Sequence, residues 1–175
     1  MATSRRPLPP PEVESRLRAQ FGDDVLAFED QRGHAVITVA PARYREMVRF
    51  LRDEPDFACD YCDFTSAVDF GDQGMEVLTH LHSTVHNHDV RMKVKLQKES
   101  PACPSISDLF PSANWHERET MEMFGIDFEG HPQPVKLLLP EPFEGHPLRK
   151  DFPLMSREAK PWPGAVEGEE EEEEE

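Results

Sequence analysis

The segment from Asn114 to Phe124 holds the residues of this chain that best suit acid–base chemistry, with three glutamates and an arginine in eleven positions. At about 100° per residue, Glu117 shares a helix face with Thr120, Met121 and Phe124, so its carboxylate is expected to be partly buried. A buried carboxylate needs a cation or several N–H donors. The pattern also fits ordinary solvated charge pairs or a helix that docks on arginines elsewhere. Catalysis by Glu117 or Glu119 is disfavoured, because no nucleophile, pocket motif or metal set accompanies them.

The sequence Phe-Glu-Gly-His-Pro occurs twice, at residues 128–132 and 143–147. Glycine permits a positive φ and proline fixes the following backbone, so each copy is expected to be a defined bend after an aromatic anchor. His131 and His146 could bind a metal, but further ligands are missing beside them.

Four histidines and two cysteines offer a second possible metal site. His80 and His82 fall on one face of an expected strand, where two histidines can chelate zinc or nickel. His86 and His88 flank Asn87 at a predicted hairpin tip and are expected to be exposed. The Cys59–Cys62 spacing lies in a strand-like segment, which favours buried thiols over a redox or metal site. The chain has no glycine-rich phosphate loop, dinucleotide motif or cluster-type cysteine set.

Composition excludes two classes of partner. The net charge is −16, and Glu167 with Glu169–Glu175 carries eight of those charges, so the rest of the chain is mildly acidic. Without a basic stripe, nucleic acid is not an expected partner. No apolar run approaches the roughly 18 residues needed to cross a bilayer, and the proline-rich start resembles neither a secretory signal nor a transit peptide. Membrane association is therefore expected only through a complex.

Apolar periodicity predicts an α+β fold with a mixed or antiparallel sheet and packed helices. Helices are expected at 12–21, after Pro41 and at 114–124, with a short helical turn at 105–108. Strands are expected at 25–29, 35–40, 57–70, 76–85 and 89–97, the third with a break around 62–66. Strict alternation of Val90, Met92, Val94 and Leu96 with polar residues makes the last strand half-buried.

The chain beyond Gly125 changes character. Residues 129–164 contain eight of the seventeen prolines together with scattered large apolar residues, so an extended arm laid on a surface is expected. The predicted organisation is a disordered N-terminal arm at 1–11, an α+β domain at 12–125, an extended proline-rich C-terminal docking arm at 126–160 and a disordered acidic tail at 161–175.

The block Glu117-Arg118-Glu119-Thr120-Met121-Glu122-Met123-Phe124-Gly125-Ile126-Asp127-Phe128 resembles the signature of the 30-kDa subunit of respiratory complex I. The likeness continues through both Gly-His-Pro turns and through the run Leu148-Arg149-Lys150-Asp151-Phe152-Pro153. Pro111, Ala113, Trp115 and the tip His86-Asn87-His88 also match, and the resemblance covers residues 12–155. Thr120 and Glu122 depart from the family pattern, and Cys59 and Cys62 are not part of it.

The resemblance implies a structural subunit of the peripheral arm of NADH:quinone oxidoreductase that binds no cofactor. Iron–sulfur clusters, FMN, NADH and quinone would belong to partner subunits. The implied partners are the 49-kDa-type subunit of the quinone site and the small iron–sulfur subunits, on the cytoplasmic side of a bacterial plasma membrane. Contacts with these partners are then expected from the signature residues Trp115, Glu117, Arg118, Glu119, Met123, Phe124, Gly125, Ile126, Phe128, Gly130, His131, Pro132, Gly145, His146, Pro147, Leu148, Arg149, Lys150, Asp151, Phe152 and Pro153.

Three alternatives remain open from the residues. The same module could serve a related membrane-bound hydrogenase or another dehydrogenase complex. A metal-binding protein would use His80, His82 and the cysteines. An independent enzyme would use Glu117 or Glu119 and would be active as the isolated chain.

Overall fold

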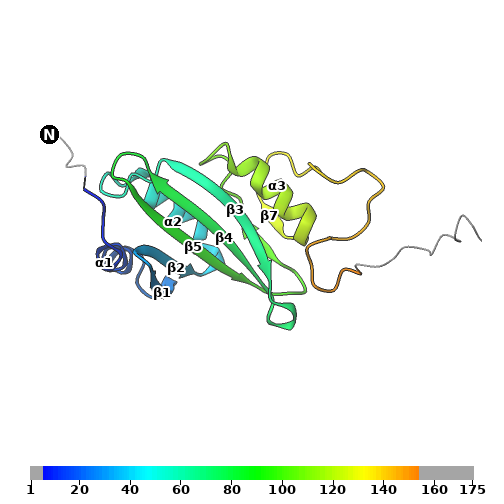
Figure 1. The fold of residues 1–175 in the computed structure, drawn as a ribbon, viewed down its shortest axis with the longest axis horizontal. Helices are drawn as coiled ribbons and strands as arrows, with labels where there is room; N and C mark the ends of the chain where they lie inside the picture. Colours follow the sequence, from blue (N-terminus) through cyan, green and yellow to red (C-terminus); the bar gives the residue numbers. More distant parts are fainter. Residues whose placement is uncertain (1–5, 154–175) are drawn as a thin grey trace, which may run out of the picture.

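A five-stranded sheet forms the centre of the molecule in a computed structural model that describes residues 6–153 (Figure 1). The strands are β1 (Val25–Gln31), β2 (His34–Val39), β3 (Tyr61–Asp69), β4 (Met75–Ser83) and β5 (His88–Leu96). Their order across the sheet is β1-β2-β5-β4-β3. All neighbours are antiparallel except β2 and β5, which are parallel, so the sheet is mixed and the predicted α+β class is confirmed.

Two helices pack on one face of this sheet. Helix α1 (Pro10–Phe21) buries Val13, Leu17 and Phe21, which recur every four residues. Helix α2 (Pro41–Asp53) begins at Pro41, as predicted, and buries a stripe of four side chains: Tyr44, Met47, Val48 and Leu51. The Tyr44 hydroxyl hydrogen-bonds the Thr79 hydroxyl of β4 at 2.7 Å, which fixes α2 against that face. The opposite face of the sheet carries neither helix.

The hairpin prediction is largely confirmed, and its tip differs. Strands β4 and β5 pair from Met75 with Leu96 to Ser83 with His88. His86 and His88 were expected to be exposed, but both are buried. The backbone folds so that Asn87 takes a positive φ of 56°, and the two imidazole rings stack inward with centroids 6.0 Å apart. The His86 Nε2 atom hydrogen-bonds the Pro55 carbonyl at 2.8 Å, which ties the tip to the end of α2.

Strand β3 starts at Tyr61 rather than at Phe57. Residues 54–58 instead form a turn that follows α2, in which the Ala58 N–H donates to the Glu54 carbonyl. The expected break appears as a register shift between Cys62 and Phe64. An extra residue in one strand bends it and increases its twist.

A second sheet was not expected from the sequence. Strand β6 (Ala102–Pro104) pairs in parallel with β7 (Asp127–Glu129). Ile126 and Phe128 are buried in the core, so the folded domain extends beyond the boundary expected at Gly125. The predicted helical turn at 105–108 is a non-helical loop closed by Leu109 and Phe110 N–H bonds to Ile106. Of the disordered N-terminal arm expected at 1–11, residues 1–5 lie outside the described residues, and Pro10 and Pro11 instead form the first turn of α1, where proline is tolerated. Residues 154–160 of the expected docking arm and the expected tail at 161–175 also lie outside the described residues.

Candidate functional site

Helix α3 (Ala113–Phe124) positions the signature side chains beside the edge of β3 (Figure 1). The helix begins at Ala113, one residue before the predicted start at 114, and Ser112 precedes its first turn. The Ser112 hydroxyl donates to the Cys62 carbonyl at 3.1 Å. The Thr120 hydroxyl donates to the His116 carbonyl of its own helix at 2.7 Å and also lies 3.4 Å from the Thr65 carbonyl. Both hydroxyls thus place α3 against strand β3. Gly125 ends the helix with φ 70°, and its N–H donates to the Met121 carbonyl, as expected for a C-terminal glycine.

Glu117 joins α3 to the loop that follows β6. Its side chain is fully buried. One carboxylate oxygen accepts from the Ile106 N–H at 2.7 Å, and the other accepts from the Ser105 hydroxyl at 2.6 Å. Burial raises the pKa of Glu117 to about 7, although these two hydrogen bonds oppose the rise. The expected burial is therefore confirmed, and hydrogen-bond donors rather than an arginine satisfy the carboxylate.

His131 lies behind Glu117, with its Nε2 atom 3.9 Å from the Glu117 carboxylate. The ring is held on both sides, because Nε2 is 3.2 Å from the Asn114 carbonyl and Nδ1 accepts from the Gln133 N–H at 3.0 Å. The first Phe-Glu-Gly-His-Pro copy thus fastens the start of the arm to α3. Gly130 has φ 82° there, which confirms the predicted bend.

Glu122 holds the middle of the arm. Its carboxylate accepts the N–H groups of Leu137, Leu138 and Leu139 at 3.0, 2.7 and 3.3 Å. One turn away, the Arg118 guanidinium donates to the carbonyls of Val135 and Lys136 at 2.9 and 3.0 Å. Three N–H donors on one carboxylate make a strong, charge-assisted anchor. A proline- and leucine-rich stretch is thereby ordered without helix or strand.

The second Phe-Glu-Gly-His-Pro copy fastens the end of the arm to the C-terminus of α3. The His146 ring bonds the Glu122 carbonyl at 2.8 Å, and the Leu148 N–H donates to the Met123 carbonyl at 3.1 Å. The Arg149 guanidinium donates to the carbonyls of Phe124 and Gly125. A cation there also complements the negative end of the helix dipole. The guanidinium of Arg149 thus engages the chain's own helix, and its contact with a partner stays a prediction.

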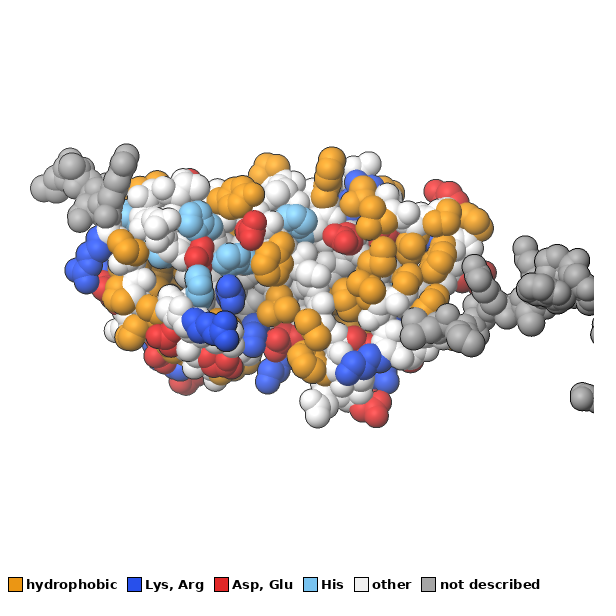
Figure 2. Space-filling view, viewed as in Figure 1, with side chains coloured by type: hydrophobic (Ala, Val, Ile, Leu, Met, Phe, Trp, Pro, Cys, Tyr) orange, Lys and Arg blue, Asp and Glu red, His pale blue; other side chains and the backbone are white. Residues whose placement is uncertain are grey.

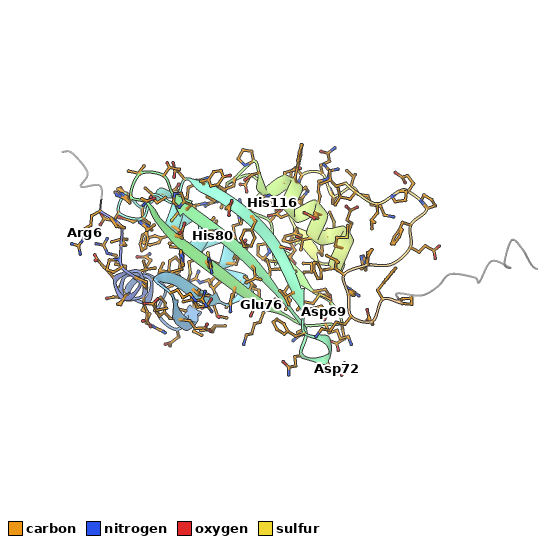
Figure 3. The ribbon with its side chains drawn as sticks, viewed as in Figure 1. Arg6, Asp69, Asp72, Glu76, His80 and His116 are labelled. Atoms are coloured by element: carbon orange, nitrogen blue, oxygen red, sulfur yellow. The ribbon has the colours of Figure 1, made fainter. Side chains whose placement is uncertain are left out.

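The last described residues return to the main sheet. The Lys150 N–H donates to the Asp69 carboxylate at 2.7 Å, at the end of β3 (Figure 3). Burial opposes ionisation of Asp69, but the N–H donors of Lys150 and Gly71 outweigh it and lower the pKa of that carboxyl. Phe143 stacks on Phe152 with ring centroids 6.0 Å apart. Residues 131–153 therefore form a loop that is anchored at its start, middle and end.

Several of the expected interface residues, namely Glu117, Phe124, Ile126, Phe128 and His131, are buried within the chain itself, so their side chains position the arm. Two others, Trp115 and Leu148, stand in solvent and are 67% and 55% exposed. Three apolar residues of the arm that were not in the expected set, Val135, Leu137 and Leu138, are exposed beside them, and Leu138 is 59% exposed. We call this set the arm surface, and it consists of Trp115, Val135, Leu137, Leu138 and Leu148. Figure 2 shows apolar side chains gathered on that half of the molecule.

The other polar clusters do not form metal sites. Within residues 6–153, no three His, Cys, Asp or Glu side chains are arranged to hold a metal ion. His80 and His82 do share a face, but His82 is hydrogen-bonded to Asp89 at 2.6 Å. Cys59, Cys62 and Cys103 are buried and unpaired, as expected for Cys59 and Cys62. Burial raises the pKa of Cys59 to about 12 and that of Cys62 to about 11, so both remain protonated thiols near neutral pH.

Residues 37–158 match the model of the family described as respiratory-chain NADH dehydrogenase, 30 Kd subunit. The chain belongs to this family. A relative from Roseiflexus castenholzii (strain DSM 13941 / HLO8), the C subunit of its NADH-quinone oxidoreductase, is 41% identical over 150 residues. That match covers 85% of this chain and 86% of the relative. The chain is accordingly a complex I subunit, and other complex I subunits are its partners.

A second relative has a longer polypeptide. The C/D subunit of NADH-quinone oxidoreductase from Serratia proteamaculans (strain 568) is 36% identical over 164 residues, in a match that covers 86% of this chain and 27% of the relative.

Solved structures share the fold. The trypsin-resistant fragment (1–134) of Nqo5 has a TM-score of 0.59 at 24% identity, over 70% of this chain and 97% of the fragment. A chain of the membrane-bound sulfane sulfur reductase (MBS), an archaeal respiratory membrane complex, has a TM-score of 0.63 at 19% identity, over 83% of this chain and 86% of that one. The fold therefore also occurs in a second kind of respiratory membrane complex.

The role of Glu122 as the anchor of the arm was not predicted. From the sequence, Glu122 could not be distinguished from the solvated glutamates of a charged helix. The leucine run 15–17 residues later was the available signal, because consecutive N–H groups without strand partners need an acceptor.

Proposed function

We propose that this chain is a cofactor-free structural subunit of the peripheral arm of proton-translocating NADH:quinone oxidoreductase. It docks on the 49-kDa-type subunit that helps form the quinone site and lies close to the small iron–sulfur subunits. It supports electron transfer from NADH to quinone by holding that assembly together. The single observation that carries this proposal is the arm surface, an exposed apolar set on backbone that Glu122 and Arg118 hold in one conformation.

Pre-organisation makes the arm surface suited to docking. A loop that is already ordered loses little conformational entropy when a partner covers it. Large apolar side chains held in solvent are costly unless they are buried in an assembly. Trp115 is of a residue type enriched among those that contribute most to interfaces, and the exposed Leu138 adds apolar area on the arm surface.

The longer relative from Serratia supports the choice of partner. Its name joins a C module and a D module in one polypeptide, of which this chain matches about a quarter. Joining two modules in one chain raises their effective concentration and suits modules that bind each other. The family resemblance implies a 49-kDa-type subunit as the neighbour, and we infer that the D module is its counterpart.

The number of cysteines supports placing the redox groups in partner subunits. Iron–sulfur clusters are usually held by four cysteine thiolates, whereas this chain has three cysteines, all of them buried. Iron–sulfur clusters, FMN, NADH and quinone are accordingly assigned to neighbouring subunits, and the isolated chain is expected to be inactive.

The proposed location is the cytoplasmic side of a bacterial plasma membrane. Between residues 6 and 153, no helix has both the length and the apolar character to cross a bilayer. Attachment through the complex supplies the membrane association in this proposal.

The test is affinity purification of the tagged chain from detergent-solubilised membranes, with identification of the co-purifying subunits and an NADH:quinone activity assay. Recovery of a 49-kDa-type subunit with NADH-linked activity supports the proposal. Recovery of hydrogenase or sulfur-reductase subunits would assign the chain to the related kind of complex. Quinone reduction by the chain alone would contradict a structural role.

A further inference from the structure

In the part of the chain that the structure describes, no helix covers the face of the main sheet opposite α1 and α2 (Figure 1). Alternation along β4 sends Thr79 toward α2 and the neighbouring Leu78 and His80 toward the open side. Figure 3 shows Glu76 and His80 on this side, in the strand between β3 and β5. We call this side the open face. Figure 2 looks onto it and shows apolar, histidine and basic side chains in separate areas.

Strand β3 lines one border of the open face with apolar side chains. Tyr61, Phe64, Val68 and Phe70 each stand 38–52% exposed along the strand and the residue after it. The solvent side of an antiparallel edge normally carries polar residues. Ser66 follows that rule, and so does Asp63, whose carboxylate lies 3.2 Å from His80 on the open face. An edge strand that still exposes four large apolar side chains indicates a contact surface.

Strand β5, two positions across the sheet from β3, lines the open face with cations. Arg91, Lys93 and Lys95 alternate on this face, paired in register with His80, Leu78 and Glu76 of β4. Lys93 is 3.9 Å from the Glu76 carboxylate. Within residues 6–153, neither Arg91 nor Lys95 forms an ion pair with a carboxylate.

The one carboxylate in the β5 row is already engaged. Asp89 lies 2.6 Å from His82, 3.2 Å from His34 and 3.5 Å from His80. Its charge is therefore directed at the histidines rather than at Arg91. Among the described residues, Arg91 and Lys95 therefore lack a carboxylate partner. Both lie across β4 from the apolar side chains of β3.

The spacing of the two rows fits a helix. Because β4 separates β3 from β5, the apolar and cationic rows lie two strand spacings apart, roughly 10 Å. That separation is about the diameter of an α-helix with its side chains. A helix lying along β4 would place one side on Phe64 and Val68 and the other beside Arg91 and Lys95.

We propose that the open face is a second docking surface, which binds an amphipathic acidic helix of a neighbouring subunit. The apolar side of that helix packs on the β3 row, and its carboxylates pair with Arg91 and Lys95. The choice of an acidic partner follows from charge complementarity with these two cations. The proposal rests on the proposed function only for the source of the helix, which is another subunit of the same complex.

A photo-crosslinking residue tests the contact directly. p-Benzoylphenylalanine replaces Tyr61 in one tagged chain and Trp115 in another, and each complex is irradiated in membranes before purification and peptide mapping. We expect position 61 to crosslink to a peptide with carboxylates and apolar residues at helical spacing, in a subunit of the complex. A crosslink to a basic peptide, to a second copy of this chain or to Glu169–Glu175 would overturn the proposal.

The Trp115 position separates the two proposals. Crosslinking at position 115 without crosslinking at position 61 would refute the open-face contact and leave the proposed function intact. Absence of crosslinks at both positions, in a chain that purifies alone, would refute the proposed function as well.

A charge-reversal pair tests the role of the cations. Arg91→Glu should weaken retention of the crosslinked subunit about tenfold, because a close ion pair is replaced by repulsion. Arg49→Glu is the matched control, since Arg49 is exposed on α2 on the other side of the sheet and should change retention less than about twofold. Reversal of the mapped partner carboxylate to arginine should restore binding of the Arg91→Glu chain. An equal loss of the partner subunit with Arg91→Glu and Arg49→Glu would contradict the assignment of Arg91 to the contact. So would a reversed partner carboxylate that does not restore binding of the Arg91→Glu chain.

Discussion

Glu117→Gln should remove most of the pH dependence of stability that this carboxylate imposes on the chain. Glutamine keeps the shape and retains an acceptor for the Ile106 N–H, while the Ser105 hydroxyl can accept from the new amide. The variant differs from the native chain mainly in having no charge to bury. Its effect therefore isolates the desolvation of one carboxylate.

The magnitude follows from the pKa of Glu117, which burial raises from 4.5 to about 7. A raised carboxyl pKa means that the folded state binds the proton more tightly than the unfolded state. The resulting stability is fully present below about pH 4.5 and is lost as pH rises to about 7. At about 1.4 kcal/mol per pKa unit, the loss is on the order of 3 kcal/mol.

The assay is urea unfolding of the full chain at several pH values between 5 and 8, followed by circular dichroism. His88, whose pKa burial lowers, contributes in the same range with the opposite sign, so the difference between native and variant chains is the quantity to use. We expect the free energy of unfolding of Glu117→Gln, minus that of the native chain, to increase by roughly 2–3 kcal/mol from pH 5 to pH 8. Glu119→Gln, at an exposed position on the same helix, is the matched control. Parallel pH profiles for native chain and Glu117→Gln would refute the reasoning.

Three further outcomes concern the arm and the thiols. Gly125→Ala should destabilise the chain by about 1–2 kcal/mol in urea unfolding, because φ is +70° and the new Cβ would lie 2.5 Å from the His146 ring; unchanged stability would contradict this. Glu122→Gln should speed amide exchange at residues 137–139 by about tenfold while the melting temperature changes little, since it weakens only the arm anchor; equal exchange rates would refute the anchor. Buried Cys59 and Cys62 should resist a thiol reagent at pH 8 until the chain is unfolded, because burial raises the pKa of both thiols; rapid reaction of the native chain would count against their burial.

The main sheet could be predicted because its hydrophobic pattern is simple. Apolar and polar residues alternate along β5 with the period of a strand, and the buried residues of α2 recur with the period of a helix. Both ends of β5 and the start of α2 were therefore predicted to within about two residues. Strands β6 and β7 escaped because three residues cannot show alternation and both flanks contain loop-forming residues. The two strands are more than twenty residues apart in the sequence, so their pairing is a tertiary interaction with no local pattern.

The burial of Glu117 could be predicted from its own helix. Glu117 shares a helix face with the large apolar side chain of Phe124, and that face was expected to be partly buried. The arm's return to α3 did not follow, because it depends on contacts between residues 15 or more apart, such as Glu122 with Leu137. The burial of His86 and His88 also escaped, since ring stacking at a hairpin tip has no local sequence pattern.

The most direct test of the central claim compares two leucines of nearly equal exposure. Leu138 on the arm surface is 59% exposed, and Leu26 on β1, away from the arm, is 58% exposed (Figure 1). The measurement is the amount of 49-kDa-type subunit that co-purifies with tagged Leu138→Asp and Leu26→Asp chains at equal chain recovery. The account predicts about a tenfold loss for Leu138→Asp, from burying a charge in an apolar interface, and little change for Leu26→Asp. Equal recovery of the partner with both variants would contradict docking through the arm surface.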